Sequence, residues 1–190
     1  MRSIAEQSGT SFIIGDLKFS MFDANVINGI KDLMIEREET ISVAESVTSG
    51  LLQAALGSAE NASQFFQGGI TVYNLAQKFR HLHVEPIHAQ NVNCVSEKVS
   101  VEMTLNCAAL FNSQWAIAIT GYASPVPEGD NKLFAYFSVS KNGKVLKQER
   151  IESGTEPGFE TQIFYTDTVL KSLVELLKNE KAPAGGAQRA

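Results

Sequence analysis

A hydroxyl-rich segment, Ala44-Glu45-Ser46-Val47-Thr48-Ser49-Gly50, is the first place where this chain could do chemistry. It joins an apolar run to a helical pattern, so Ser46 would lie at the carboxyl end of a strand and the amino end of a helix. Backbone N–H groups in the first turn of a helix have no helical partner, and they can hold an oxyanion or an anionic ligand. Gly50 would allow close approach of the backbone. The alternative is that Ser46 or Thr48 only caps the helix.

Tyr73 and Lys78 form a second candidate pair, with Tyr73 at a strand end and Lys78 on the helix that follows. A serine nucleophile needs a base, but the three histidines are clustered at positions 81, 83 and 88 and give no Ser-His-Asp set. A neutral lysine can replace histidine, as in Ser-Lys enzymes. Its pKa must then fall from about 10.4 toward 7, which requires burial or nearby donors. The alternatives are a packed tyrosine and a solvated lysine.

The loop Thr120-Gly121-Tyr122-Ala123-Ser124-Pro125 follows the most apolar strand-like run of the chain. Loops at the carboxyl ends of strands are where open α/β sheets bind ligands. The alternative is a plain connection rich in glycine and proline. The histidines have no carboxylate or cysteine at a metal-ligand spacing, and Cys94 and Cys107 do not form a Cys-x-x-Cys pair. We therefore expect no metal site.

Hydrophobic periodicity predicts the elements that must position these residues. Helices are expected from Asp23, over 48–56, through 78–79, from Ser96 to 110 and over 158–178. Strands are expected at 11–14, 40–44, 65–73, 115–120, 133–140 and 144–152, with Asn142-Gly143 turning a hairpin between the last two. Residues 81–93 are expected to be irregular.

This order indicates an α/β fold, namely a three-layer α/β/α domain with a mixed, mostly parallel sheet and a late antiparallel hairpin. We expect an N-terminal extension over 1–22, one domain over 23–180 and a disordered tail over 181–190.

Composition restricts the classes of function. The chain has 190 residues, of which 44% are hydrophobic, and a net charge of −5. A chain of this size can bury a core without disulfides. Its acidic balance and lack of a basic run argue against nucleic acid or an anionic membrane as a partner. No window is long and apolar enough to span a bilayer, and the N-terminus lacks a signal peptide. We expect a soluble, cytoplasmic protein.

In this order, the three segments resemble the CinA C-terminal domain family, whose characterised members are nicotinamide-nucleotide amidases. The family motif A-E-S-C-T-G-G corresponds to residues 44–50, Y-x4-K to Tyr73 and Lys78, and T-G-x-A-G-P to residues 120–125. A V-S-E helix start corresponds to residues 95–97. The resemblance covers about residues 25–178.

The resemblance implies an amide hydrolysis that converts nicotinamide mononucleotide and water to nicotinic acid mononucleotide and ammonia. Ser46 would attack the carboxamide carbon, Lys78 would take its proton, and Tyr73 would relay or position that proton. Glu45 would support the site. The residues implied to hold the oxyanion or the substrate are Thr48, Ser49, Gly50, Thr120 and Gly121.

The resemblance further implies no cofactor, a small pyridine nucleotide as the ligand and a homo-oligomer. Full-length family members carry an additional N-terminal domain, which this chain is too short to hold, so we expect a stand-alone amidase domain.

The sequence also departs from the family pattern. Ser49 and Ser124 replace glycines, Glu128 and Asp130 add negative charge beside the expected phosphate, and the last helix opens without the usual arginines. Two hypotheses follow: an active amidase on a pyridine nucleotide or related amide, or an impaired or repurposed member that acts as a nucleotide-binding or assembly domain.

Overall fold

The computed structural model describes residues 11–14 and 17–180, and every statement below concerns these residues. A five-stranded sheet has the order β4-β3-β5-β6-β7. Its strands are β3 (Ile41–Glu45), β4 (Phe66–Thr71), β5 (Trp115–Gly121), β6 (Phe134–Lys141) and β7 (Lys144–Glu152). The pairs β3–β4 and β3–β5 are parallel, whereas β5–β6 and β6–β7 are antiparallel. This is the expected mixed sheet.

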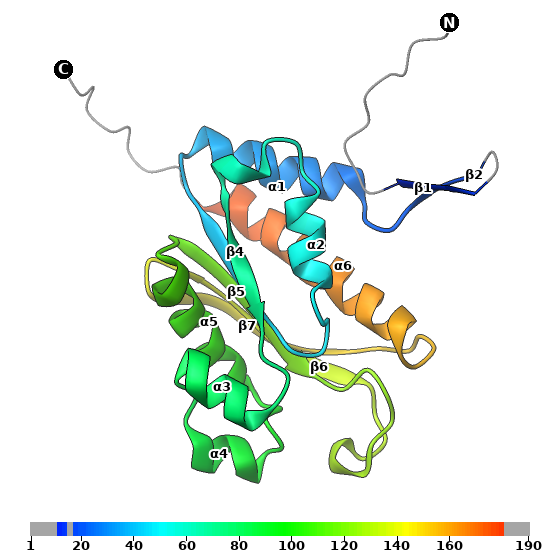
Figure 1. Ribbon diagram of the computed structural model, residues 1–190, viewed down its shortest axis with the longest axis vertical. Coiled ribbons are helices and arrows are strands. Elements are labelled where there is room, and N and C mark those ends of the chain that lie inside the picture. Colours follow the sequence, from blue (N-terminus) through cyan, green and yellow to red (C-terminus); the bar gives the residue numbers. More distant parts are fainter. Residues whose placement is uncertain (1–10, 15–16, 181–190) are drawn as a thin grey trace, which may run out of the picture.

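Helices cover both faces of the sheet and complete the three layers (Figure 1). One face carries α1 (Ala24–Glu36), α2 (Leu51–Gly57) and α6 (Phe159–Asn179). The other carries α3 (Leu75–Leu82), α4 (Pro86–Asn91) and α5 (Glu97–Phe111). Two short 3-10 turns, η1 (Ala62–Gln64) and η2 (Pro127–Gly129), lie in the connections. No helix among the described residues has the length and apolar character to cross a membrane.

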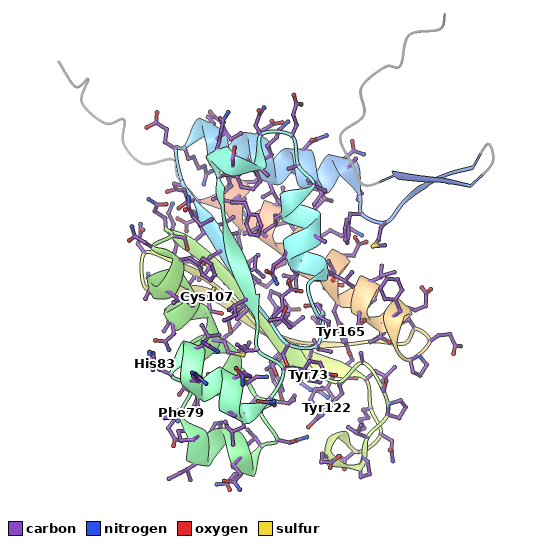
Figure 2. The ribbon with its side chains drawn as sticks, in the orientation of Figure 1. Tyr73, Phe79, His83, Cys107, Tyr122 and Tyr165 are labelled. Atoms are coloured by element: carbon purple, nitrogen blue, oxygen red, sulfur yellow. The ribbon has the colours of Figure 1, made fainter. Side chains whose placement is uncertain are left out.

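Side chains that alternate between the two faces of the sheet form two hydrophobic cores of different size. On β5, Trp115, Ile117 and Ile119 pack with α1, α2 and α6, whereas Ala116 and Ala118 face α5. Small side chains on the second face let α5 lie close to the sheet. Figure 2 shows the two sides, with Cys107 on the α5 side and Tyr165 on the α6 side.

Side-chain caps explain where several helices begin. Asp23, Asn74 and Ser96 have extended backbones and accept hydrogen bonds from the N–H groups two or three residues later. These bonds satisfy donors that the first turn of a helix leaves unpaired. The cap at Asn74 matters for the site because it starts the helix that carries Lys78.

The structure corrects several predicted boundaries. Residues 81–93 are not wholly irregular, because Pro86 opens α4 and the carboxylate of Glu85 accepts the N–H groups of Ile87 and His88. The second helix starts at Leu51 rather than residue 48, and β4 ends at Thr71. The predicted strand β1 (Ser11–Ile14) is confirmed, and it pairs with an unpredicted strand, β2 (Leu17–Ser20). The predicted tail over 181–190 lies outside the described residues.

Chain order creates a switch point at the carboxyl edge of the parallel strands. The connection from β3 to β4 passes through α2 on one face, whereas the connection from β4 to β5 passes through α3, α4 and α5 on the other. In open α/β sheets such a point leaves a crevice outside the strand ends. Ser46, Tyr73 and Thr120 all come from this edge.

Candidate active site

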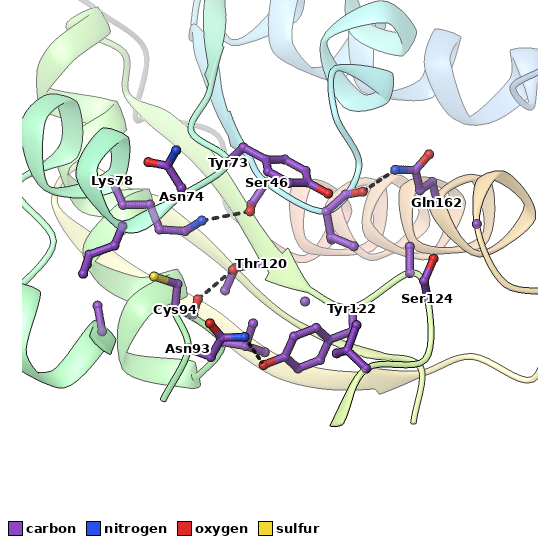
Figure 3. A pocket seen from close by; sticks show the side chains of 18 of the residues that line it. Ser46, Tyr73, Asn74, Lys78, Asn93, Cys94, Thr120, Tyr122, Ser124 and Gln162 are labelled. Carbon is purple, nitrogen blue, oxygen red and sulfur yellow. Dashed lines mark hydrogen bonds between the residues drawn. The ribbon is translucent and has the colours of Figure 1, made fainter. Parts of the chain in front are cut away.

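A cavity of about 550 Å³ opens at this edge of the sheet. Ser46 lines it just after β3, Tyr73 just after β4, and Thr120 and Gly121 at the end of β5. The start of α6 closes another side (Figure 3). The volume falls in the range of small-molecule sites.

Ser46 and Lys78 lie in direct contact in this cavity. Lys78 Nζ donates hydrogen bonds of 2.8 Å to Ser46 Oγ and of 2.8 Å to the carbonyl oxygen of Val72. The N–H of Val72 bonds to Glu45 O at 2.8 Å, which ties this residue to the end of β3. The lysine amine is therefore fixed on the serine hydroxyl by the residues that directly follow two neighbouring strands.

Burial makes Lys78 an unusual lysine. Its side chain is only 1% exposed, and burial lowers the pKa of the amine from 10.5 to about 8. About one lysine in ten is then neutral at pH 7, and a neutral amine can accept a proton. The structure thus places an amine of lowered pKa against Ser46 Oγ, which is the position that a general base would need.

Glu45 fills the amino end of α2 with its own carboxylate. The buried carboxylate accepts the N–H groups of Gly50, Leu52 and Gln53 at 2.9–3.1 Å and the hydroxyl of Thr48 at 2.5 Å. An acidic side chain at this end also suits the helix dipole. Glu45 therefore caps the helix that follows the Ser46 turn.

This cap corrects the predicted oxyanion site. Thr48, Ser49 and Gly50 do not line the cavity. The N–H of Gly50 is taken by Glu45, and that of Ser49 bonds to Ser46 O at 3.3 Å. Ser49 also has a φ of 52°, the left-handed conformation that favours glycine. These residues shape the turn and leave no free donor there from Ser49 or Gly50.

Val47 supplies a better candidate donor. It lines the cavity directly after Ser46, and within the described chain its N–H has no hydrogen-bond partner. Its carbonyl oxygen accepts a 2.7 Å hydrogen bond from Gln162 Nε2 on α6 (Figure 3). Because a peptide unit is planar, this bond fixes the orientation of the Val47–Thr48 peptide, the one after the peptide that carries the Val47 N–H. Gln162 thus ties the turn of the nucleophile to the opposite wall.

Tyr73 lines the cavity but does not complete a hydrogen-bonded triad. Its side chain is 70% exposed, and in the described part of the chain its hydroxyl bonds to neither Ser46 nor Lys78. Figure 3 shows the ring extending past Ser46, with the hydroxyl away from the lysine amine. The structure brings Ser46 and Lys78 together and leaves Tyr73 at the mouth.

Thr120 and Gly121, the last two residues of β5, line the cavity. The Thr120 hydroxyl donates to the carbonyl oxygen of Cys94 at 2.8 Å, so it holds the 94–95 segment in place. Gly121 has no room for a side chain, since a Cβ would lie 2.4 Å from the backbone oxygen of Phe134. Burial raises the pKa of the Cys94 thiol, and the nearby charge of Lys78 opposes that shift.

Three other lining residues, Asn93, Phe159 and Gln162, come from segments that the sequence motifs do not mark. Asn93 and Tyr122 meet across the cavity, where Asn93 Nδ2 donates to the Tyr122 hydroxyl at 3.1 Å (Figure 3). Phe159 and Gln162 come from the start of α6, far along the chain. Their only sequence signal is the predicted helix start at Gly158, where the family pattern has arginines and this chain has none.

Comparison with known proteins agrees with the motifs. The family described as the CinA C-terminal domain matches residues 23–165. A CinA-like protein of Picosynechococcus sp. is 42% identical over 103 residues, which cover 54% of this chain and 25% of that protein. One from Prochlorococcus marinus strain MIT 9515 is 32% identical over 147 residues, covering 76% of this chain and 34% of that protein. The chain thus spans about a third or less of these two relatives.

Solved structures share the fold. The competence damage-inducible protein A of Klebsiella pneumoniae has a TM-score of 0.78 at 24% identity, covering 83% of this chain and 98% of that one. A CinA superfamily protein of Enterobacter cloacae has a TM-score of 0.76 at 25% identity, covering 88% and 98% of the two chains. With the family match spanning most of the sequence, this chain belongs to the CinA C-terminal domain family.

Proposed function

We propose that this protein is an amidohydrolase that converts the primary carboxamide of a pyridine nucleotide, or of a related amide, to a carboxylate and ammonia. The observation that carries the proposal is the 2.8 Å contact between the buried Lys78 amine and the Ser46 hydroxyl beside a ligand-sized cavity. A hydroxyl paired with an amine of lowered pKa is the arrangement of Ser-Lys hydrolases.

The first half of the reaction forms an acyl-enzyme. The neutral amine of Lys78 accepts the Ser46 proton while Oγ attacks the carboxamide carbon. The negative charge that develops on the carboxamide oxygen is stabilised by the free N–H of Val47. The tetrahedral intermediate then expels its nitrogen, and the Lys78 ammonium returns the proton so that ammonia leaves.

The second half releases the acid. Water enters the position left by ammonia, and Lys78 takes one of its protons as the oxygen attacks the acyl carbon. Collapse of the second intermediate breaks the bond to Ser46 Oγ, which recovers its proton from Lys78. No proton is gained or lost by the enzyme over the cycle, and the same amine serves as base and acid in each half.

The test is ammonia release from nicotinamide mononucleotide and from a panel of pyridine carboxamides, measured at neutral pH. Ser46→Ala is the inactive variant. Ser58→Ala is the matched control, because the Ser58 hydroxyl bonds only to Ala55 O at the far end of α2. Release by the wild type and by Ser58→Ala, but not by Ser46→Ala, supports the proposal. No release from any amide of the panel overturns it.

Two further observations favour the alternative of a binding or assembly domain. The first turn of α6 lacks the arginines of the family pattern, and among the described residues the Tyr73 hydroxyl makes no hydrogen bond to Ser46 or Lys78. A member without turnover would still bind its ligand in the same cavity. Calorimetric binding without ammonia release is the outcome that would select this alternative.

A further inference from the structure

The charge of the cavity wall restricts which amide can bind. Among the described residues that line the cavity, Lys78 is the only cation, and none is an arginine or a histidine. Lys78 is buried and already donates to Ser46 and Val72. Arg80 on α3 and Lys132 after η2, the next cations along these segments, lie outside the lining. A phosphate dianion would therefore find no free cation here.

The start of α6 does not replace a missing cation. Gly158 precedes the helix without a side-chain cap, and its own N–H is used by Ala123 O at 2.6 Å. The first turn carries an acidic residue, Glu160, in place of a basic one. A carboxylate in this turn already complements the positive end of the helix dipole, so it competes with any phosphate for that end.

Negative charge also lies beside the cavity. A smaller neighbouring hollow of about 530 Å³ shares Asn93 and Tyr122 with the main cavity and includes Glu128. The chain as a whole carries −5. Each of these charges opposes the approach of a dianion more than that of an uncharged or cationic ligand.

The remaining wall suits an aromatic ring and uncharged polar groups. Tyr73, Tyr122 and Phe159 line the cavity, and Tyr73 and Phe159 are 70% and 52% exposed. Aromatic faces stack on planar rings and attract a pyridinium cation. The side-chain amides of Gln90 and Asn93 can bond to sugar hydroxyls.

We propose that the cavity takes an aromatic carboxamide without a phosphate group, a pyridine riboside in preference to its mononucleotide. The inference rests on the proposed function for its reacting group and on the cavity wall for its selectivity. The carboxamide would lie at Ser46, the ring against the aromatic side chains, and the ribose toward Asn93. The position that a phosphate would take is then left to solvent near Glu160.

Binding tests this selectivity separately from turnover. The Ser46→Ala variant of the full chain is titrated calorimetrically with nicotinamide riboside and with nicotinamide mononucleotide. We expect the riboside to bind at least about tenfold more tightly, because the negative charges beside the cavity repel the phosphate dianion of the mononucleotide. Raising the salt concentration should strengthen binding of the mononucleotide, because screening weakens repulsion.

A charge reversal supplies the second arm. Glu160→Arg, made in the Ser46→Ala background, places a cation at the first turn of α6. It should reduce the ratio of riboside affinity to mononucleotide affinity severalfold. Glu175→Arg makes the same charge change on an exposed part of the same helix, 15 residues and about 22 Å away. It should leave the ratio of the two affinities unchanged.

Each outcome decides the inference. Equal or tighter binding of the mononucleotide, or binding of neither ligand, overturns it. Tighter binding of the riboside by Ser46→Ala supports it even if the wild type releases no ammonia, in which case the proposed hydrolysis fails and the selectivity stands. Ammonia release from the mononucleotide at a higher kcat/KM than from the riboside overturns the selectivity and leaves the hydrolysis standing.

Discussion

Replacing Lys78 by methionine should make the protein inactive and more stable at once. Burial lowers the pKa of the amine from 10.5 to about 8. One pKa unit corresponds to about 1.4 kcal/mol, so holding the charged amine in the fold at pH 7 costs about 3 kcal/mol. Methionine has a similar stem and no charge, but it leaves the carbonyl of Val72 without its donor, a loss of about 1 kcal/mol. We expect a net gain of about 2 kcal/mol in the free energy of unfolding.

The pH dependence of this gain has a definite sign. The folded pKa of Lys78 is lower than the unfolded one, so between about pH 8 and 10.5 the unfolded chain binds a proton that the native protein does not. Wild-type stability from this group therefore rises through that window and is constant below it. The advantage of Lys78→Met should be full at pH 7 and should shrink toward pH 10.

Chemical denaturation at pH 7 and pH 9.5 measures the difference, with ammonia release as the second readout. Activity should fall by about a hundred- to ten-thousand-fold, the usual contribution of a general base. Lys171→Met is the matched control, because that lysine is exposed on α6 and its ion pair with Asp167 is worth little. A Lys78→Met protein that is less stable than wild type at pH 7, or an advantage that does not change with pH, would refute the reasoning.

Substitutions at three other positions test the shape of the site. Gln162→Ala should lower kcat about tenfold with KM little changed, because it frees the Val47–Thr48 peptide and so loosens the turn that holds the Val47 N–H. Gln162→Glu, which keeps the size of the side chain but loses the donor, should do the same. An equal rise in KM would point to substrate binding instead. Glu45→Gln should lower the free energy of unfolding by about 2 kcal/mol, since an amide cannot accept all the donors that the carboxylate accepts, and a variant as stable as wild type by thermal melting would contradict the cap. Ser49→Gly should raise the free energy of unfolding by about 1 kcal/mol, since it removes the backbone strain of a serine in the left-handed conformation. Ser49→Ala should give no such gain. A similar gain from both variants would show that backbone conformation is not the cause.

The sequence predicts the layered fold and the central pair because both depend on local signals. Ser46 lies where an apolar strand pattern changes to a helical one. Lys78 lies on the short helix that follows the next strand. Parallel strands end at one edge, so residues that follow them must meet there. The burial of Lys78 could only be named as a requirement, because it depends on packing against segments from elsewhere in the chain.

The sequence-based predictions of the site fail where a long side chain forms a hydrogen bond with a group that the sequence pattern does not point to. The N–H groups of Ser49 and Gly50 read as free donors, but Glu45 reaches forward over the turn and takes one of them. Gln162 lies 115 residues from Val47 and has no periodic signal, so its contact is a product of tertiary packing. The helix that begins at Pro86 has six residues, too few to show a helical repeat of apolar positions in the sequence.

The central claim is that a neutral Lys78 activates Ser46, and covalent labelling tests it without knowledge of the substrate. The rate at which a small sulfonyl fluoride modifies Ser46 is followed from pH 6 to pH 10 by intact mass, with peptide mapping to separate Ser46 from Lys78. The account predicts a rate that rises with pH and levels off with a midpoint near the Lys78 pKa of about 8, and no such rise for Ser46 in Lys78→Met. A Ser46 labelling rate that is the same in both proteins at every pH would contradict it.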